Sequence, residues 1–397
     1  MCFPDFSTIR VMQLQLPEPS PDALAASHAL QNLIADEIAR HDGWISFARY
    51  MELALYAPDL GYYSGGAAKL GKDGDFTTAP EITPLFGQTL AHIVSELMLQ
   101  SVPQVLEFGA GTGKLAVDIL TECAAAGITV EQYYIVELSG ELRARQQQAL
   151  SEFPQVTWLD DFPPAFSGVV LGNEVLDAMP VSLVVKGEAG WLERGVSIEA
   201  GRLVFVDRPC DVELVAQIPE AENLPIGYLT EVHPIAVGFM RSLATMFDAG
   251  FEQSGKGGAA VLLDYGFPAS EYYLDQRATG TLMCHYRHHS HDDPFYLPGL
   301  QDITAHVDFS AMAYAAVRSG LEMVGYMSQA GFLLAGGLAE RLLQTSPNDV
   351  LRYLPQTNAV QKLTSPAEMG ELFKVLVLGK NVVLPDQFDR ADQSHRL

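Results

Sequence analysis

The segment from Val105 to Gly113 reads V-L-E-F-G-A-G-T-G, an apolar run that ends in an acidic residue followed by three glycines at alternate positions. The apolar run predicts a buried β-strand. The glycines predict a tight turn whose backbone takes unusual conformations or lies against a ligand. Residues Leu115 to Leu120 then predict a helix whose N-terminus faces that ligand. This order indicates an α/β sheet that binds a nucleotide-like cofactor.

The spacing of the glycines shows which of the common cofactor-binding motifs this segment matches. A P-loop needs a glycine five residues before its Gly-Lys pair and Ser or Thr after it, and this chain lacks both. A dinucleotide fingerprint needs its third glycine at the position of Lys114. Gly109, Gly111 and Gly113, with Glu107 ahead of them, instead resemble motif I of the class I S-adenosylmethionine methyltransferases. A glycine-rich turn without a ligand is the alternative.

Acidic residues follow the next two predicted strands, where ligands bind in open α/β sheets. The segment Gln132 to Glu137, Q-Y-Y-I-V-E, ends in a carboxylate that we expect to bind ribose hydroxyls. Its distance from the glycine turn exceeds the usual spacing of about twenty residues. Asp161 is expected to accept a hydrogen bond from an adenine amino group. The alternatives are that Glu137 caps a helix near Ser139 and that Asp161 is a cap or an ordinary loop acid.

The fourth predicted strand ends in Asn173 and Glu174, which open the segment N-E-V-L-D-A-M-P. We expect this position to face a transferable methyl group. A carboxylate there suits a cationic acceptor: Glu174 can hold a guanidinium in a bidentate pair and localise its charge away from the attacking nitrogen. Asp177 shares that face if a helix starts here. The alternative is that Glu174 is a helix N-terminal residue favoured by the macrodipole.

Apolar segments alternate with helical patterns along most of the chain, which predicts a doubly wound, mostly parallel, seven-stranded Rossmann-like α/β sheet. Two insertions interrupt it, a β-hairpin region at about 181–225 and a loop at 267–309 that is rich in His and Asp. The expected strands are Val102 to Phe108, Tyr133 to Glu137, Val156 to Leu159, Gly168 to Gly172, Ala259 to Asp264, Met323 to Ser328 and Phe373 to Leu378.

Three regions divide the chain in this interpretation. Residues 1–100 form an N-terminal helical region with a long glycine-rich loop, and 101–384 form the cofactor-binding core. Residues 385–397 are polar and are expected to be a loose tail.

Composition limits the partners and the compartment. The 397 residues carry a formal net charge of −25, which disfavours nucleic acid and anionic membrane surfaces and favours cationic partners. The same charge can simply keep the protein soluble. Four scattered cysteines without a C-x-x-C pair indicate neither disulfides nor zinc. With no secretory signal, transit peptide or membrane-length apolar run, we expect a cytoplasmic protein, of bacterial type.

A cluster of histidines at 285, 288, 289 and 291, followed by Asp292 and Asp293, suggests a metal site at first sight. Its spacing matches no common zinc pattern, and so short a loop cannot readily close a tetrahedral site with its supporting shell. We therefore predict no metal and expect a segment that contacts substrate or orders the loop.

Several segments together resemble one family, the MidA-like S-adenosylmethionine-dependent methyltransferases, which include a mitochondrial complex I assembly arginine methyltransferase. The resemblance runs from about Ile45 to Leu384. It rests on G-Y-Y, G-K-D-G-D-F-T-T-A-P-E-I, E-F-G-A-G-T-G, N-E-V-L-D-A-M-P, L-L-D-Y-G, H-Y-R-H-H-S-H-D-D-P-F and Q-D-I-T-A-H-V-D-F.

The resemblance implies a class I fold, S-adenosylmethionine as cofactor, and arginine methylation of a respiratory-complex-type subunit. It implies that the three glycines flank the methionine part of the cofactor and that Glu137 binds its ribose. The loop from Gly74 to Glu81 is then expected to close over the cofactor, through Thr77, Thr78 and Pro80.

Two other functions stay open. One is a nicotinamide-dependent dehydrogenase on a similar sheet, and the other is a non-catalytic assembly factor that retains a cofactor-binding scaffold. The expected partner is a protein substrate, without nucleic acid or membrane, and a homodimer is one expected assembly.

Overall fold

The predicted glycine turn follows β2 (Gln104–Phe108), an interior strand of the main sheet. The computed structural model describes residues 16–65 and 77–397. The path through the sheet is β15 (Glu322–Ser328), β16 (Phe373–Lys380), β10 (Gly258–Phe267), β5 (Val169–Asn173), β2 (Gln104–Phe108), β3 (Gln132–Val136) and β4 (Val156–Leu159). The five strands from β10 to β4 are parallel, whereas β16 is antiparallel to both of its neighbours.

The predicted α/β class is therefore confirmed, and every predicted core segment overlaps a strand of this sheet. The predicted strand number differs, because the two-residue β14 (Val307–Asp308) pairs with the end of β10 and makes the described sheet eight-stranded.

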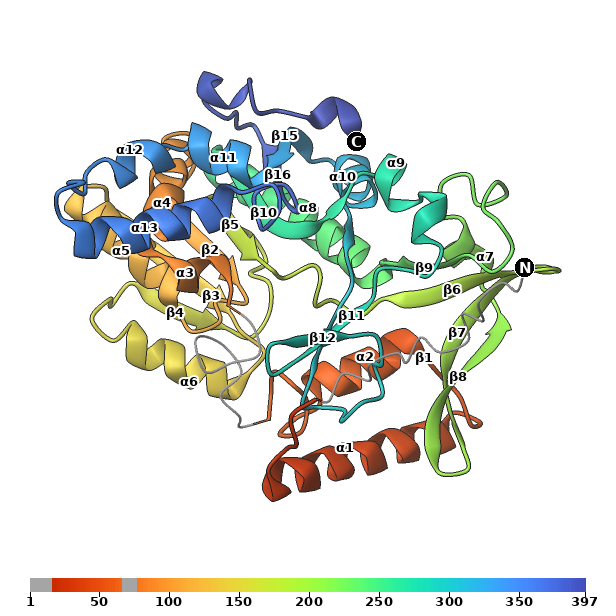
Figure 1. Cartoon of the computed structure of the whole chain (residues 1–397). Coiled ribbons are helices and arrows are strands. Elements are labelled where there is room, and N and C mark those ends of the chain that lie inside the picture. The colour runs from red at the N-terminus through yellow and green to blue at the C-terminus, as the bar shows by residue number, and fades with distance from the viewer. Residues whose placement is uncertain (1–15, 66–76) are drawn as a thin grey trace, which may run out of the picture.

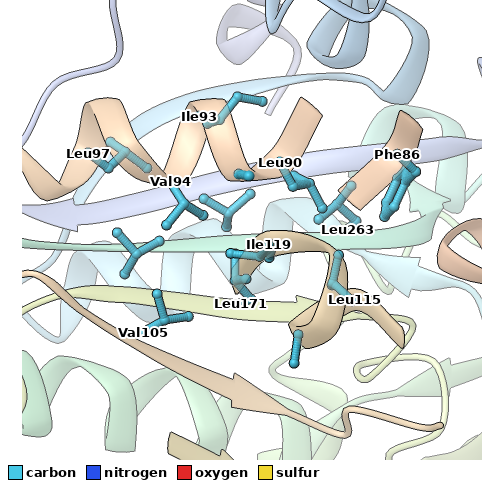
Figure 2. Packing of buried hydrophobic residues seen from close by; sticks show 14 of the residues in the cluster. Phe86, Leu90, Ile93, Val94, Leu97, Val105, Leu115, Ile119, Leu171 and Leu263 are labelled. Atoms are coloured by element: carbon cyan, nitrogen blue, oxygen red, sulfur yellow. The ribbon is translucent and has the colours of Figure 1, made fainter. Parts of the chain in front are cut away.

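Side chains alternate across the sheet and build two separate cores. On one face, Val105 and Val169 pack with α4 (Pro84–Met98) and α5 (Lys114–Ala125). Figure 2 shows Leu90, Val94 and Leu97 of α4 over the strands. On the other face, the next residues along each strand pack with α8 (Pro234–Ser254) and α10 (Phe309–Arg318). Burial on both faces explains why these strands are continuous apolar runs.

The remaining helices are short or peripheral to these cores. They are α1 (Pro21–Arg40), α2 (Phe47–Tyr56), α3 (Ala79–Ile82), α6 (Gly140–Ala149), α7 (Val212–Val215), α9 (Ala269–Tyr272), α11 (Gln329–Ala335), α12 (Leu338–Leu342) and α13 (Val350–Thr364).

Serine caps fix where three of the helices begin. The side chains of Ser20, Ser46 and Ser139 accept hydrogen bonds from backbone amides in the first turns of α1, α2 and α6. Such caps satisfy donors that a helix start otherwise leaves unpaired. The helix placed near Ser139 by the sequence begins at Gly140.

The first insertion is a sheet of its own. It contains β6 (Ser182–Gly187), β7 (Gly190–Glu199), β8 (Arg202–Pro209) and β9 (Leu229–Val232), with β1 (Ile45–Ser46) along the edge of β7. Ala200 and Gly201 form the turn that joins β7 to β8, and both residues have positive φ, as a type I′ hairpin turn requires.

The second insertion is less irregular than its composition predicts. It holds a three-stranded antiparallel sheet of β11 (Met283–Tyr286), β12 (His289–His291) and β13 (Asp302–Thr304). Buried residues of β6, β7, β11 and β13 share a third core with α1 and α2, which lie apart from the main sheet (Figure 1). The two insertions and the N-terminal helices therefore form one packed layer beside the main sheet.

The expectation of a loose tail at residues 385–397 is wrong. Phe388 is only 2% exposed and packs in the core around α11. Asp392 accepts a hydrogen bond from the amide of Tyr326 at 3.0 Å, and Arg396 pairs with Glu271. One buried aromatic side chain thus anchors an otherwise polar segment. The boundaries at residues 100 and 384 remain predictions, although α4 already packs on the main sheet.

Candidate active site

A cavity of about 780 Å³ lies at the carboxyl ends of β2, β3, β4 and β5, the position that open α/β sheets use for ligands. Its volume is within the range of about 300 to 1,000 Å³ for small-molecule sites. Most predicted site residues line it, namely Glu107, Gly109, Gly111, Glu137, Asp161, Thr78, Pro80, Asn173 and Glu174. Gly113, Asp177 and Thr77 are described but do not line it.

The glycine turn has the backbone that its sequence predicts. Gly109, Gly111 and Gly113 have φ values of 62°, 55° and 83°, a region that L-residues with side chains rarely adopt. Gly109 and Gly111 line the cavity, whereas Gly113 caps α5 and faces α6, where an added Cβ would lie 3.4 Å from Cα of Gln146. The first two glycines open the cavity wall, and the third allows close packing behind it.

Gln146 of α6 joins the glycine turn to the second strand end. Its side-chain amide donates to the carbonyl of Gly111 at 2.9 Å and to Oε2 of Glu137 at 2.8 Å. Its oxygen accepts from the indole of Trp158 at 3.0 Å. The side chain is fully buried, so all three bonds are shielded from water. Gln146 was not predicted as a site residue, because its role depends on three partners that only the fold brings together.

Glu137 lines the cavity. One of its carboxylate oxygens accepts the hydrogen bond from Gln146, and the other accepts a hydrogen bond from the amide of Ser139 at 2.9 Å. Burial raises the pKa of this carboxyl, and the two hydrogen bonds oppose the rise. Ser139 itself caps α6, so the cap that the alternative interpretation assigned to Glu137 is made by its neighbour. Glu137 is left oriented by fixed donors at the edge of the cavity.

Glu107 at the end of β2 is almost fully buried and accepts a hydrogen bond from the hydroxyl of Tyr133 at 2.7 Å. Burial raises the pKa of Glu107 to about 7, although the tyrosine bond lowers it. Its protonation state therefore changes near neutral pH, unlike that of an ordinary carboxyl.

The third strand end combines acidic and aromatic side chains. Asp161 lines the cavity and accepts from the amide of Phe162 at 2.7 Å, while Asp160 pairs with Arg143. The ring of Phe162 lies 4.7 Å from that of Phe108 and 5.3 Å from that of Phe239, centroid to centroid. This end of the cavity therefore offers apolar ring surface beside carboxylates.

The segment that precedes α4 meets the glycine turn from the opposite side. Thr78 and Pro80 line the cavity, Thr112 hydrogen-bonds to Glu81, and the amide of Ala79 donates to Glu174. Of the loop expected to close over a cofactor, 74–76 lie outside the described residues. The described remainder, 77–81, contacts both the glycine turn and the fourth strand end.

Glu174 lies where the cavity passes from the glycine turn towards α2. It is a non-glycine residue with positive φ, 56°, and its carboxylate accepts from Nδ2 of Asn173 at 3.1 Å. Burial raises its pKa to about 8, with a smaller contribution from the nearby carboxyl of Asp177. Backbone strain of this kind clusters at functional sites.

No helix starts at Glu174, because this residue has a left-handed backbone conformation and the chain continues as a turn to Pro180 before β6. The alternative interpretation of Glu174 as a helix N-terminal residue is therefore wrong. Asp264 at the end of β10 fixes the turn instead. Its Oδ2 accepts from the amides of Val175, Leu176 and Asp177 at 3.1, 2.8 and 3.3 Å. The sequence analysis gave Asp264 no role, since its partners lie nearly ninety residues away.

Asp177 is buried behind this turn. Burial raises its pKa to about 6, a hydrogen bond from Tyr265 opposes the rise, and its Oδ1 has no hydrogen-bond partner among the described residues. Oδ1 of Asn173 is likewise buried without a partner in the described part of the chain. No salt bridge recorded for the described residues involves Glu174, Asp177 or Asp264. The turn after β5 thus brings together carboxyl groups and unpartnered oxygens that no basic side chain of the described chain pairs with.

The histidine cluster forms the β11–β12 hairpin, whose turn residues Arg287 and His288 have positive φ. Within residues 16–65 and 77–397, no three His, Cys, Asp or Glu side chains are arranged to hold a metal ion. Over the same residues, no helix is both long and apolar enough to cross a bilayer.

Comparison with known proteins identifies relatives along most of the chain. Residues 85–327 match the model of a family described as a putative S-adenosyl-L-methionine-dependent methyltransferase. Mitochondrial protein arginine methyltransferases named NDUFAF7 are 30% identical in Danio rerio, covering 84% of this chain and 82% of theirs, and in Xenopus tropicalis, covering 90% and 87%. The expected cytoplasmic location is wrong by this comparison, because these curated relatives are mitochondrial.

Two solved structures share the fold closely. A COG1565 superfamily member from Burkholderia thailandensis, bound to S-adenosyl-homocysteine, is 53% identical with a TM-score of 0.90 and covers 96% of this chain and 100% of its own. A second structure of a COG1565 protein from that organism is 51% identical with a TM-score of 0.87 and the same coverage.

Proposed function

Because the chain belongs to the family of S-adenosylmethionine-dependent methyltransferases, we propose that its cavity binds this cofactor at the glycine turn and a cationic acceptor beside Glu174. The chain is an enzyme of that class, and the dehydrogenase and the assembly factor are no longer the favoured alternatives. The residues that hold cofactor and acceptor, and the identity of the acceptor, are the subject of the proposal.

The residues around the cavity fit S-adenosylmethionine. Gly109 and Gly111 leave the cavity wall without side chains, and the oriented carboxylate of Glu137 suits the two ribose hydroxyls. Phe162 and Leu138, the latter 71% exposed although apolar, would cover the adenine, with Asp161 near its amino group. Glu107, Thr78 and Pro80 would complete the cofactor end, with Gly113 and Thr77 supporting it from outside the cavity.

When bound, S-adenosylmethionine supplies a methyl group activated by a sulfonium. The chain must then align a nucleophile and exclude water. The carboxylate of Glu174 would hold the acceptor guanidinium and draw its positive charge away from the attacking nitrogen. The side-chain amide of Asn173 orients Glu174 by donating a hydrogen bond to it. The unpartnered Oδ1 of Asn173 can accept a hydrogen bond from the guanidinium that is to be methylated. Asp177 acts through Glu174 by raising its pKa.

Glu174 has a further use in this scheme. A bound cation would favour the ionised carboxylate. The ionised carboxylate can then accept the proton that must leave the methylated nitrogen.

Arginine is the acceptor that the observations favour. The curated relatives are named protein arginine methyltransferases. The acceptor end combines Glu174, which forms no salt bridge within the described residues, with the unpartnered oxygen of Asn173. The charge of −25 also favours a cationic protein segment. A subunit of a respiratory complex is the candidate that follows from the family resemblance, and a homodimer remains a prediction.

The experiment that tests this function supplies methyl-labelled S-adenosylmethionine and a cell extract to the purified protein. Mass spectrometry of the labelled products should find methylarginine in a protein. Label found only on lysine, on carboxylates or on small molecules would contradict the proposal.

A further inference from the structure

One face of α2 lines the acceptor end of the cavity over the whole length of the helix. Arg49, Glu52 and Tyr56, together with the cap Ser46, line the cavity at intervals of three or four residues, the spacing of a single helical face. Tyr63, from the loop that follows α2, lines the same region. Neither tyrosine was assigned a role from the sequence.

The two tyrosine rings are held in a fixed arrangement. They stack with centroids 5.5 Å apart and planes 24° apart. The hydroxyl of Tyr56 donates to the carbonyl of Ala178 at 2.8 Å, and that of Tyr63 donates to Oδ1 of Asp302 at 3.0 Å. Since both hydroxyls already bind the protein, the pair lines the cavity chiefly with aromatic ring surface.

The charged residues that line the cavity near the tyrosine pair favour a cationic ligand. Arg49 is the arginine on this face of α2, and it is engaged by Glu37 at 2.9 Å and Glu52 at 2.8 Å. Glu174 lines the same cavity without a basic partner among the recorded salt bridges of the described chain. An aromatic wall in the same cavity as a buried carboxyl group is a favourable environment for an organic cation.

We infer that Tyr56 and Tyr63 form an aromatic wall that binds the planar guanidinium of the acceptor and selects arginine over lysine. This inference rests on the proposed function and adds the residues that set its specificity. A guanidinium is flat and weakly hydrated, so it stacks on a ring while its edge pairs with a carboxylate. A lysine ammonium is compact and strongly hydrated, and it gains less from a flat wall.

The test measures binding of ethylguanidinium chloride and ethylammonium chloride to the full chain saturated with S-adenosylhomocysteine, by NMR titration. The variants are Tyr56→Leu and Tyr63→Leu, which remove a ring, and Tyr56→Phe, which keeps the ring but not the hydroxyl. Tyr314→Leu is the matched control, because Tyr314 is exposed on α10 and does not line the cavity. Thermal melting and S-adenosylhomocysteine affinity check that each variant is folded.

The wild type should bind ethylguanidinium more tightly than ethylammonium. Each leucine variant should weaken ethylguanidinium binding by about 5- to 30-fold, the size of a desolvated cation–π contact. Tyr56→Phe and Tyr314→Leu should stay within about twofold of the wild type. Equal binding of the two cations by the wild type, no binding of ethylguanidinium, or unchanged binding in the folded leucine variants would overturn the inference.

Glu174→Gln separates this inference from the proposed function. If it weakens ethylguanidinium binding while the leucine variants do not, the acceptor site stands and the aromatic wall is wrong. If the leucine variants weaken binding and Glu174→Gln does not, the wall stands and the role of Glu174 is wrong.

Discussion

At the scale of single residues, the glycine turn is the part of the site most directly determined by sequence. Gly111 lines the cavity with φ of 55°, and a β-branched residue is a genuine outlier in that region. We expect Gly111→Val to lower the affinity for S-adenosylhomocysteine by at least about 100-fold in calorimetry, because the valine both strains the turn and fills the cavity.

Gly127→Val is the matched control for backbone strain. Gly127 has φ of 71°, an added Cβ would meet no atom within 4 Å, and the residue lies outside the cavity. It should lose stability without losing cofactor affinity. Unchanged affinity in Gly111→Val would remove the glycine turn from the cofactor site.

Gln146 provides a second prediction at this scale. Gln146→Leu leaves the indole of Trp158 and one oxygen of Glu137 without a partner in the interior. Unsatisfied buried groups cost about 1 to 3 kcal/mol each, so we expect both a lower melting temperature and a cofactor affinity reduced about tenfold or more. Gln148→Leu, on the exposed face of α6, should change neither. A Gln146→Leu variant with full affinity would show that Glu137 needs no positioning.

The residues that sequence alone could not provide share one property, a partner far away along the chain. Gln146 looks like any polar residue of a polar helix, and only the fold brings it to Gly111 and Glu137. Asp264 belongs to the L-L-D-Y-G motif, but its role is to accept hydrogen bonds from backbone amides of the turn after Glu174. In contrast, Gly109 and Glu137 follow predicted strands directly, so their positions could be predicted from order and spacing.

At the scale of elements, burial decides which strands could be predicted. Strands β2, β5 and β10 are covered on both faces and are apolar runs, so they could be predicted from their sequence alone. The short strands β12 and β13 of the second insertion, with three residues each, carry no such pattern. Their pairing depends on contacts with α2 and β11 rather than on periodicity.

The C-terminal segment also shows the effect of burial, here of a single side chain. Phe388 is buried against Phe332 at the end of a polar sequence. Truncating a buried phenylalanine costs about 3 to 5 kcal/mol, and we expect Phe388→Ala to lower the free energy of unfolding by about 3 kcal/mol in denaturant titration. Leu351→Ala, at a leucine that is 89% exposed on α13, should stay within about 0.5 kcal/mol of the wild type. An equally small effect of Phe388→Ala would mean that the tail is loose after all.

At the scale of the whole molecule, several buried carboxyls share raised pKa values. Burial raises the pKa of Glu107 to about 7, of Glu174 to about 8 and of Asp308 to about 6. These groups hold protons in the folded chain that the unfolded chain has already released, so the stability that they contribute is fully present below the unfolded pKa near 4 and is lost as pH rises towards 8. Denaturant titrations between pH 4.5 and 8 should show this decline.

A substitution at Glu107 can distinguish two causes of the loss of stability at higher pH, the burial of carboxyl groups and the general charge repulsion of an acidic protein. The contribution of Glu107 to the slope is about 1.4 kcal/mol per pH unit between the two pKa values, and Glu107→Gln should remove that part. Glu131→Gln, at an exposed position, removes the same charge and should leave the slope nearly unchanged. Equal slopes in all three proteins would contradict burial as the source.

The role of Glu174 is tested most directly by Glu174→Gln, studied with the acceptor identified by methyl labelling. The affinity of this variant for S-adenosylhomocysteine should stay within about twofold of the wild type, because Glu174 serves the acceptor. Methyl transfer should be reduced by about 100-fold or more, the loss typical of removing a preorganised charge contact. Full methyl transfer by Glu174→Gln, with cofactor affinity unchanged, would contradict the proposal that this carboxylate holds the cationic acceptor.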